Sequence, residues 1–171
     1  MFWLMRSGWA AAAMALVGSG VQPLWAQADA FGRWQQRPSH CVLEHGSAPP
    51  IRCHGLQLDQ RSAEVLRLSV QAEGVARGEL VQFTLVGALV EGDAPMGCRQ
   101  GACSLTRPLN LSLSSISTAR FDGRGLARTL PETLPVRGAC RIDVALVHCE
   151  AISTGQAEAA GQAWTLRAEL R

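Results

Sequence analysis

Histidine and cysteine lie side by side at three places in this sequence, and both residue types bind transition metals. The first two pairs, His40-Cys41 and Cys53-His54, flank a segment with Gly and Pro that predicts a turn. A hairpin there would set Cys41 opposite Cys53 and His40 opposite His54, which are the ligand types of a zinc site. Adjacent residues of a strand point to opposite faces, so these four side chains converge only with a bulge. We therefore expect a disulfide between Cys41 and Cys53 and predict no metal site.

The third pair, His148-Cys149, keeps a metal-binding alternative open, in which His40, His54 and His148 are the ligands. Gly97 precedes Cys98 and Gly101 lies between Cys98 and Cys103, and the spacing of the two cysteines is wider than that of a Cys-X-X-Cys redox motif. This spacing favours a small disulfide loop.

Signatures of catalysis are missing from the chain, so we predict no catalytic residue and no cofactor. The Gly-X-Ser-X-Gly pattern is absent, and so are the glycine motifs that bind phosphates and dinucleotides. Glu91 and Asp93 could serve as a carboxylate pair for glycoside cleavage, but one acidic loop is more typical of a solvated surface. The enzymatic alternative is a small secreted hydrolase that uses His45 or His148 with a carboxylate.

These residues must be positioned by strands, because apolar and polar residues alternate along most of the chain. Alternation over Glu64 to Glu73 predicts a half-buried strand, and Leu80 to Val90, apolar on both faces, predicts a central one. Further alternation occurs from Leu109 to Ser114 and from Trp164 to Leu170. We expect the following residues of these and neighbouring strands to form the core: Leu66, Leu68, Val70, Phe83, Leu85, Leu111, Leu113, Val144, Leu146 and Leu166.

Turn signals divide the second half of the chain. Asp122-Gly123 predicts a tight hairpin turn with Gly125 to Leu130 as the partner strand. Pro131 and Pro135 then predict an interruption, and Arg141 to Ala151 predicts another strand. The best helical candidate is Gln156 to Ala163, which is short and contains a glycine.

About seven or eight short strands in roughly 130 residues predict an all-β domain. The expected architecture is a small antiparallel β-sandwich or partly open barrel, stapled by disulfides, with minimal helix outside the leader.

The first 26 residues are typical of a secretory signal peptide, with Arg6, an apolar stretch from Trp9 to Val17 and small residues near Ala26. Residues 27–39 are polar and predict a linker, and residues 40–171 predict a single domain. The apolar run is shorter than a bilayer requires, so we expect no membrane span after cleavage.

All six cysteines follow the predicted leader, and their even number predicts disulfides in an oxidising compartment: Cys41, Cys53, Cys98, Cys103, Cys140 and Cys149. Local pairing joins Cys41 with Cys53 and Cys98 with Cys103, which leaves Cys140 for Cys149. An unbroken strand would hold the last two about 30 Å apart. We therefore predict that the chain reverses near Val144-Ala145, although turn residues are lacking there.

The charge is nearly balanced, with 16 basic residues against 14 acidic ones and a net charge of +2. This balance argues against a nucleic-acid partner. Every basic residue is arginine, which suggests a GC-rich genome and, with the leader, bacterial export to the periplasm or the extracellular space. We expect a non-enzymatic binding or structural module that contacts an envelope protein or a surface polymer through a sheet edge or the loop from Gly92 to Gly101.

Overall fold

The computed structural model describes residues 31–155 and 161–170. The predicted signal peptide, residues 1–26, and most of the helical candidate Gln156 to Ala163 lie outside the described residues. Every regular element within the described ranges is a β-strand. Those ranges contain no helix with the length and apolar character needed to cross a membrane.

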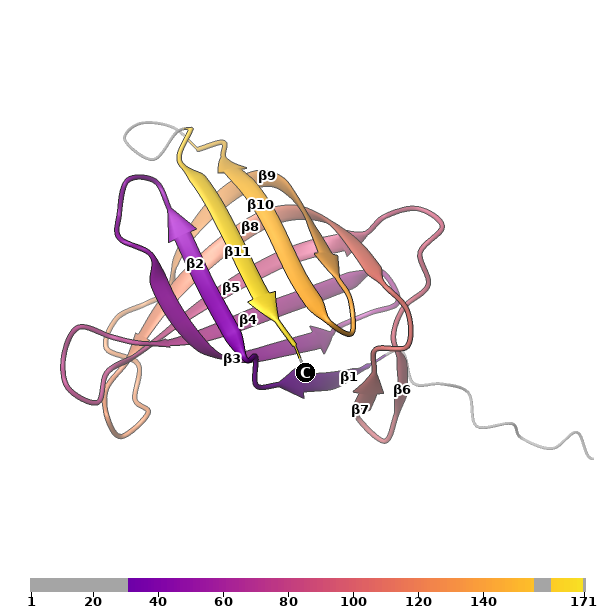
Figure 1. Cartoon of the computed structure of the whole chain (residues 1–171), viewed down its shortest axis with the longest axis horizontal. Coiled ribbons are helices and arrows are strands. Elements are labelled where there is room, and N and C mark those ends of the chain that lie inside the picture. The colour runs from indigo at the N-terminus through magenta and orange to yellow at the C-terminus, as the bar shows by residue number, and fades with distance from the viewer. Residues whose placement is uncertain (1–30, 156–160, 171) are drawn as a thin grey trace, which may run out of the picture.

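Eight strands form a closed antiparallel barrel (Figure 1). In chain order they are β2 (His40–His45), β3 (Ile51–Gln60), β4 (Val65–Glu73), β5 (Leu80–Leu89), β8 (Leu109–Phe121), β9 (Glu132–Ile142), β10 (Leu146–Ser153) and β11 (Ala163–Glu169). Each strand pairs with the next, and β11 pairs with β2 to complete the circle. The all-β prediction is confirmed, and the barrel is closed.

Consecutive strands run in opposite directions, so the connections fall alternately at two ends of the barrel. We call the end that carries the loops 46–50, 74–79 and 122–131 the open end. The opposite end carries the connections 61–64, 90–108 and 143–145 and is called the filled end. Leucine and isoleucine side chains occupy the interior toward the filled end, among them the fully buried Leu66, Leu111 and Ile142.

Three further strands cover the filled end: β1 (Gly32–Gln36), β6 (Gly97–Arg99) and β7 (Ala102–Ser104). β2 pairs with β3 at Arg52 and Ile51, and β1 takes over the same edge from Leu56 to Gln60. The predicted linker 27–39 therefore needs correction, because residues 32–36 form a strand. The residues of β1 alternate between half-buried and exposed, and none of them is fully buried, so the strand carries few apolar residues that could show the alternation.

An ion pair fixes β1 to the barrel. Arg33 Nε donates to Asp59 Oδ1 at 2.8 Å, and Gln57 Nε2 donates to Asp59 Oδ2 at 2.8 Å. Burial raises the pKa of Asp59, but the hydrogen bonds from Arg33 and Gln57 outweigh burial and hold that pKa below its ordinary value of 3.8. The carboxylate therefore stays charged and joins β1 to β3.

The predicted core is confirmed at eight of its positions: Leu66, Leu68, Val70, Phe83, Leu85, Leu111, Leu113 and Leu166 are buried. The prediction that Val144 is buried is wrong, because this residue lies in the turn between β9 and β10 and is 57% exposed. Leu146, the first residue of β10, is only half-buried. Both discrepancies have one cause, which is the reversal of the chain at residues 143–145.

Two predicted elements in the second half of the chain are also wrong. Residues 125–130 form no strand, because the chain after Phe121 makes a wide loop that is joined to β8 by a single bridge to Ala127. The true partner of β8 is β9, which runs through Pro135. A register shift next to Pro135 accommodates the residue that lacks a backbone N–H.

The three disulfides follow the predicted local pattern. Cys41 pairs with Cys53 across the β2–β3 seam, Cys98 with Cys103 in the β6–β7 hairpin, and Cys140 with Cys149 between β9 and β10. The predicted reversal is confirmed: Asp143 N–H donates to the Leu146 carbonyl at 2.8 Å, so Arg141 to Ala151 is not one strand. Three disulfides indicate an oxidising, extracytoplasmic environment.

Candidate functional site

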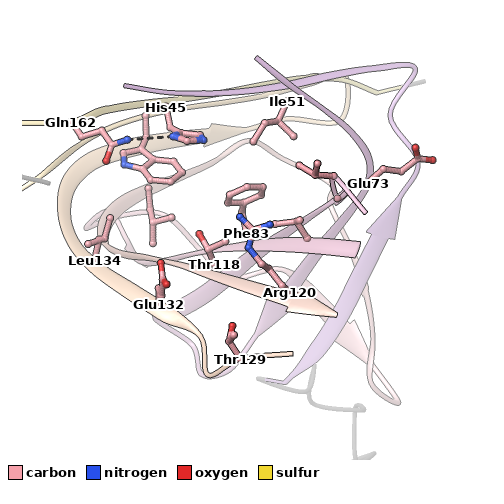
Figure 2. Close-up of a pocket in the computed structure, with 15 residues that line it drawn as sticks. His45, Ile51, Glu73, Phe83, Thr118, Arg120, Thr129, Glu132, Leu134 and Gln162 are labelled. Carbon is pink, nitrogen blue, oxygen red and sulfur yellow. Dashed lines mark hydrogen bonds between the residues drawn. The ribbon is translucent and has the colours of Figure 1, made fainter. Parts of the chain in front are cut away.

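A pocket of about 490 Å³ enters the barrel interior at the open end. Figure 2 shows His45, Ile51 and Gln162 along one side and Thr118, Arg120, Thr129 and Glu132 on the other, with Phe83 between them. The volume falls within the range of small-molecule pockets, roughly 300 to 1,000 Å³. An eight-stranded barrel is wide enough either to be filled by its own side chains or to hold one small ligand.

Strand register arranges the pocket wall in rows of increasing depth. Arg120 pairs with Val81 nearest the open end. Thr118 lies one row deeper, between Phe83 on β5 and Glu132 on β9. The next row contains Ile116 and Leu134. The wall is therefore polar at the mouth and apolar inside.

Three rings from different parts of the sequence meet in this pocket. The ring of His45 stacks on Trp164 with centroids 4.8 Å apart and an interplanar angle of 22°. Phe83 meets Trp164 edge to face at 6.2 Å. Since Phe83 is on β5 and Trp164 on β11, the contact crosses the barrel interior. These rings form a rigid aromatic surface beside the apolar rows.

Small neighbours make room for the indole. Trp164 pairs with Ala151, which pairs with Gly138, so the two strands beside it carry almost no side chain at this level. A Cβ atom on Gly138 would collide with the backbone of Ala151. The indole Nε1 of Trp164 is buried and has no hydrogen-bond acceptor among the described residues. Buried tryptophan N–H groups usually have one.

Hydrogen bonding orients the imidazole of His45. Gln162 Nε2 lies 3.3 Å from His45 Nδ1, as the dashed line in Figure 2 marks. His45 is half-buried, and its contacts are the Gln162 amide and two rings. Figure 2 shows Glu73, a carboxylate of the same pocket, turned away from the other labelled residues. The arrangement suits stacking and hydrogen bonding.

Two carboxylates hold the rim loops in place. Glu79 accepts a hydrogen bond from the Ala76 N–H at 3.2 Å and contacts Arg128 at 3.3 Å. The pKa of Glu79 lies below its ordinary value of 4.5, chiefly because of the bond from Ala76 and also because of Arg128 and Arg120. Its side chain thus connects loop 74–79 with loop 122–131.

Asp122 stabilises the second rim loop from within. It accepts hydrogen bonds from the backbone N–H groups of Leu126 at 3.0 Å and Arg124 at 2.9 Å. The Leu126 bond, followed by the Arg124 side chain, lowers the pKa of Asp122 below its ordinary value of 3.8. These hydrogen bonds hold the wide loop after β8 in a defined conformation.

The candidate residues of the sequence analysis are dispersed. His45 lies in the pocket, whereas His148 lies on the outer face of β10, 3.4 Å from Glu150. Cys41 and Cys53 are joined to each other, and the described residues contain no cluster of three or more His, Cys, Asp or Glu placed to hold a metal ion. The structure thus does not bring His40, His54 and His148 together as a ligand set.

The loop proposed as a binding surface, Gly92 to Gly101, is partly engaged inside the molecule. Met96 is buried, and its backbone N–H donates to the side chain of Gln60 at 2.7 Å. Asp93, expected to be solvated, accepts hydrogen bonds from the backbone and side chain of Asn110 at 2.7 and 3.1 Å.

Sequence reasoning missed the polar wall of the pocket: Thr118, Arg120, Glu132 and Gln162. The alternation of hydrophobicity gave no signal for it. The register shift between Leu113 and Ser115 moves the inward positions of β8 to Ile116, Thr118 and Arg120, and two of these residues are polar. Comparison of the chain with models of protein families, with curated proteins and with solved structures finds no match.

Proposed function

We propose that this protein is an exported, non-enzymatic binding module that holds a small amphipathic molecule in the open end of its barrel. The observation that carries the proposal is the pocket of about 490 Å³ with an apolar interior and a polar mouth. The three disulfides and the predicted leader support export, and the arginine-only composition supports a bacterial periplasm or exterior as the destination.

The wall chemistry favours one orientation of the ligand. An apolar body would lie against Ile116 and Leu134 and stack on the Trp164 ring, while a polar head would remain near Thr118 and Arg120. Burial of the body supplies the free energy of binding, since each fully buried methylene contributes about 0.8 kcal/mol. Dodecanoate and the fluorescent anion 1-anilinonaphthalene-8-sulfonate both have this character.

A titration of the purified exported protein with 1-anilinonaphthalene-8-sulfonate, followed by displacement with dodecanoate, tests the proposal. Thr118→Phe fills the pocket and should abolish saturable fluorescence enhancement. Thr133→Phe is the matched control, because Thr133 is exposed on the neighbouring strand and does not line the pocket. Equal binding by both variants would place the dye elsewhere and contradict the proposal.

The hydrolase alternative has weaker support. His45 lines the pocket together with Glu132, which favours it, but the imidazole of His45 forms its hydrogen bond with the Gln162 amide. A general base in a hydrolase is ordinarily oriented by a carboxylate. Hydrolysis of a nitrophenyl ester that is lost in His45→Ala and retained in His148→Ala would establish this alternative. An envelope protein or a surface polymer as partner stays a prediction.

A further inference from the structure

We infer that the rim of the open end docks on anionic lipid bilayers, so that the pocket opens toward a membrane surface. The rim consists of loop 74–79 and loop 122–131. This inference goes beyond the proposed function, because it concerns where the protein meets its surroundings and not what fills the pocket.

The rim presents three apolar side chains to solvent. Val75 is 100% exposed, Leu130 88% and Leu126 57%. Val75 and Leu130 are the two most exposed large apolar residues in the described part of the chain. Both belong to the end at which the pocket opens, and Val75 and Thr129 line the pocket itself.

The loops that carry these residues are held in fixed positions. Arg128 N–H donates to the Arg120 carbonyl at 2.8 Å, and a Cβ on Gly123 would lie 3.4 Å from the Gly78 carbonyl oxygen, so the two loops are in contact. Asp122 N–H donates to the Leu126 carbonyl at 2.9 Å. Because the loops are already ordered, apolar tips can be buried without a further loss of backbone entropy.

Charges at the rim are layered, with carboxylates inside and guanidinium groups outside. The Arg128 side chain is 52% exposed against 7% for its partner Glu79, and Arg124 is 80% exposed against 30% for Asp122. Arg120 lies over Glu79 in the same way, and Arg77 is exposed in the other loop. Two further carboxylates at this end, Glu73 and Glu132, belong to the adjoining strands β4 and β9, and both residues line the pocket and are exposed.

In the two rim loops, an approaching surface therefore meets arginine and apolar side chains before it meets Glu79 or Asp122. This combination fits an anionic bilayer, where basic residues contact headgroups and apolar residues enter the acyl boundary. A neutral bilayer would take up the apolar residues but would not attract the arginines. A nucleic acid or a polyanionic sugar would attract the arginines but would not bury the apolar residues.

Co-sedimentation with vesicles tests the inference. The full exported protein should sediment with vesicles of phosphatidylglycerol and phosphatidylcholine and remain in solution with phosphatidylcholine alone. Leu126→Ser with Leu130→Ser should weaken partitioning about tenfold or more. Arg77→Gln should weaken it about fivefold and reduce its dependence on salt.

Matched controls lie at the filled end, where Val90 and Val144 are 46% and 57% exposed. Val90→Ser with Val144→Ser should leave partitioning unchanged. Absence of sedimentation with anionic vesicles, or equal losses in the two double variants, would overturn the inference. Binding of 1-anilinonaphthalene-8-sulfonate without vesicles should persist in the Leu126→Ser, Leu130→Ser variant, so a failure of the docking surface is distinguishable from a failure of the pocket.

Discussion

At the filled end of the barrel, leucine and isoleucine side chains pack in the interior, and the segment 90–108 closes over them with Met96 and Leu105 buried. At the open end, the same strands carry Thr118, Arg120 and Glu132 in their inward positions. β8 pairs with β5 and with β9 at both ends, and each pairing has a register shift between the two ends. The two ends therefore differ in their inward side chains and are separated by these shifts, so that a packed interior and a cavity lie at opposite ends of one sheet.

The largest difference between the two ends should appear on truncation of an interior side chain. Leu111 is fully buried toward the filled end, so Leu111→Ala leaves a cavity and should lower the free energy of unfolding by about 2 to 5 kcal/mol. Thr118→Ala, facing the pocket, should cost less than about 1 kcal/mol. Urea denaturation measures both, and comparable losses would mean that the pocket wall is packed as tightly as the core.

Removal of the disulfide between β2 and β3 should have the next largest effect on stability. β2 and β3 share two register pairs, and Cys41–Cys53 lies beside them, so the covalent bond supplements a weak part of the circle. Replacing both cysteines by alanine should cost about 2 to 4 kcal/mol. Alkylation of the unreduced, denatured protein should label no cysteine, and any labelled peptide would show that a bridge is missing.

Most of the fold could be predicted because its strands have a polar outside and an apolar inside. In β4 the buried Val70 and Ala72 alternate with the exposed Gln71 and Glu73, and that pattern defines the strand without any tertiary information. Barrel closure could not be predicted in this way, because it depends on β11 pairing with β2 across most of the chain. The disulfide pattern could be predicted from local spacing, and it in turn required the turn at residues 143–145.

The site was harder to predict because residues that face a pocket need not be apolar. The inward positions of β8 and β9 near the open end are Thr118, Arg120 and Glu132, so the alternation of hydrophobicity disappears where the function is proposed. The Asp122-Gly123 signal then placed a tight hairpin where the chain makes a wide loop, since Asp122 caps backbone N–H groups across that loop. His45 was identified as a candidate from its type, but its stacking on Trp164 depends on the register of β2 and β11.

Removal of a side-chain amide should give a smaller difference in stability between the two ends. Gln60 is 2% exposed and bonds both the N–H and the carbonyl of Met96, at 2.7 and 3.4 Å, which attaches segment 90–108 to the filled end. Gln60→Ala leaves these backbone groups without that partner and should cost about 1 to 3 kcal/mol. Gln162→Ala at the open end removes one part-buried hydrogen bond to His45 and should change stability by less than about 0.5 kcal/mol. Thermal or urea unfolding of the two variants decides whether the filled end depends on this attachment.

Acid should affect the open end through the carboxylates of its rim, and this effect should be the smallest of the four. The pKa of folded Glu79 lies below 4.5, so its stabilising contribution is complete above that pH and is lost as the pH falls through the folded value. Below pH 4.5 the wild-type protein should thus lose stability with decreasing pH, and Glu79→Gln should show a shallower slope over the same interval. Above that pH the variant should be the less stable of the two, because it no longer attracts Arg128 and Arg120. Hydrogen exchange at the Ala76 amide, which donates to Glu79, reports the same event locally. Parallel slopes for the two proteins would show that other carboxylates, such as Asp59 at the filled end, account for the acid response.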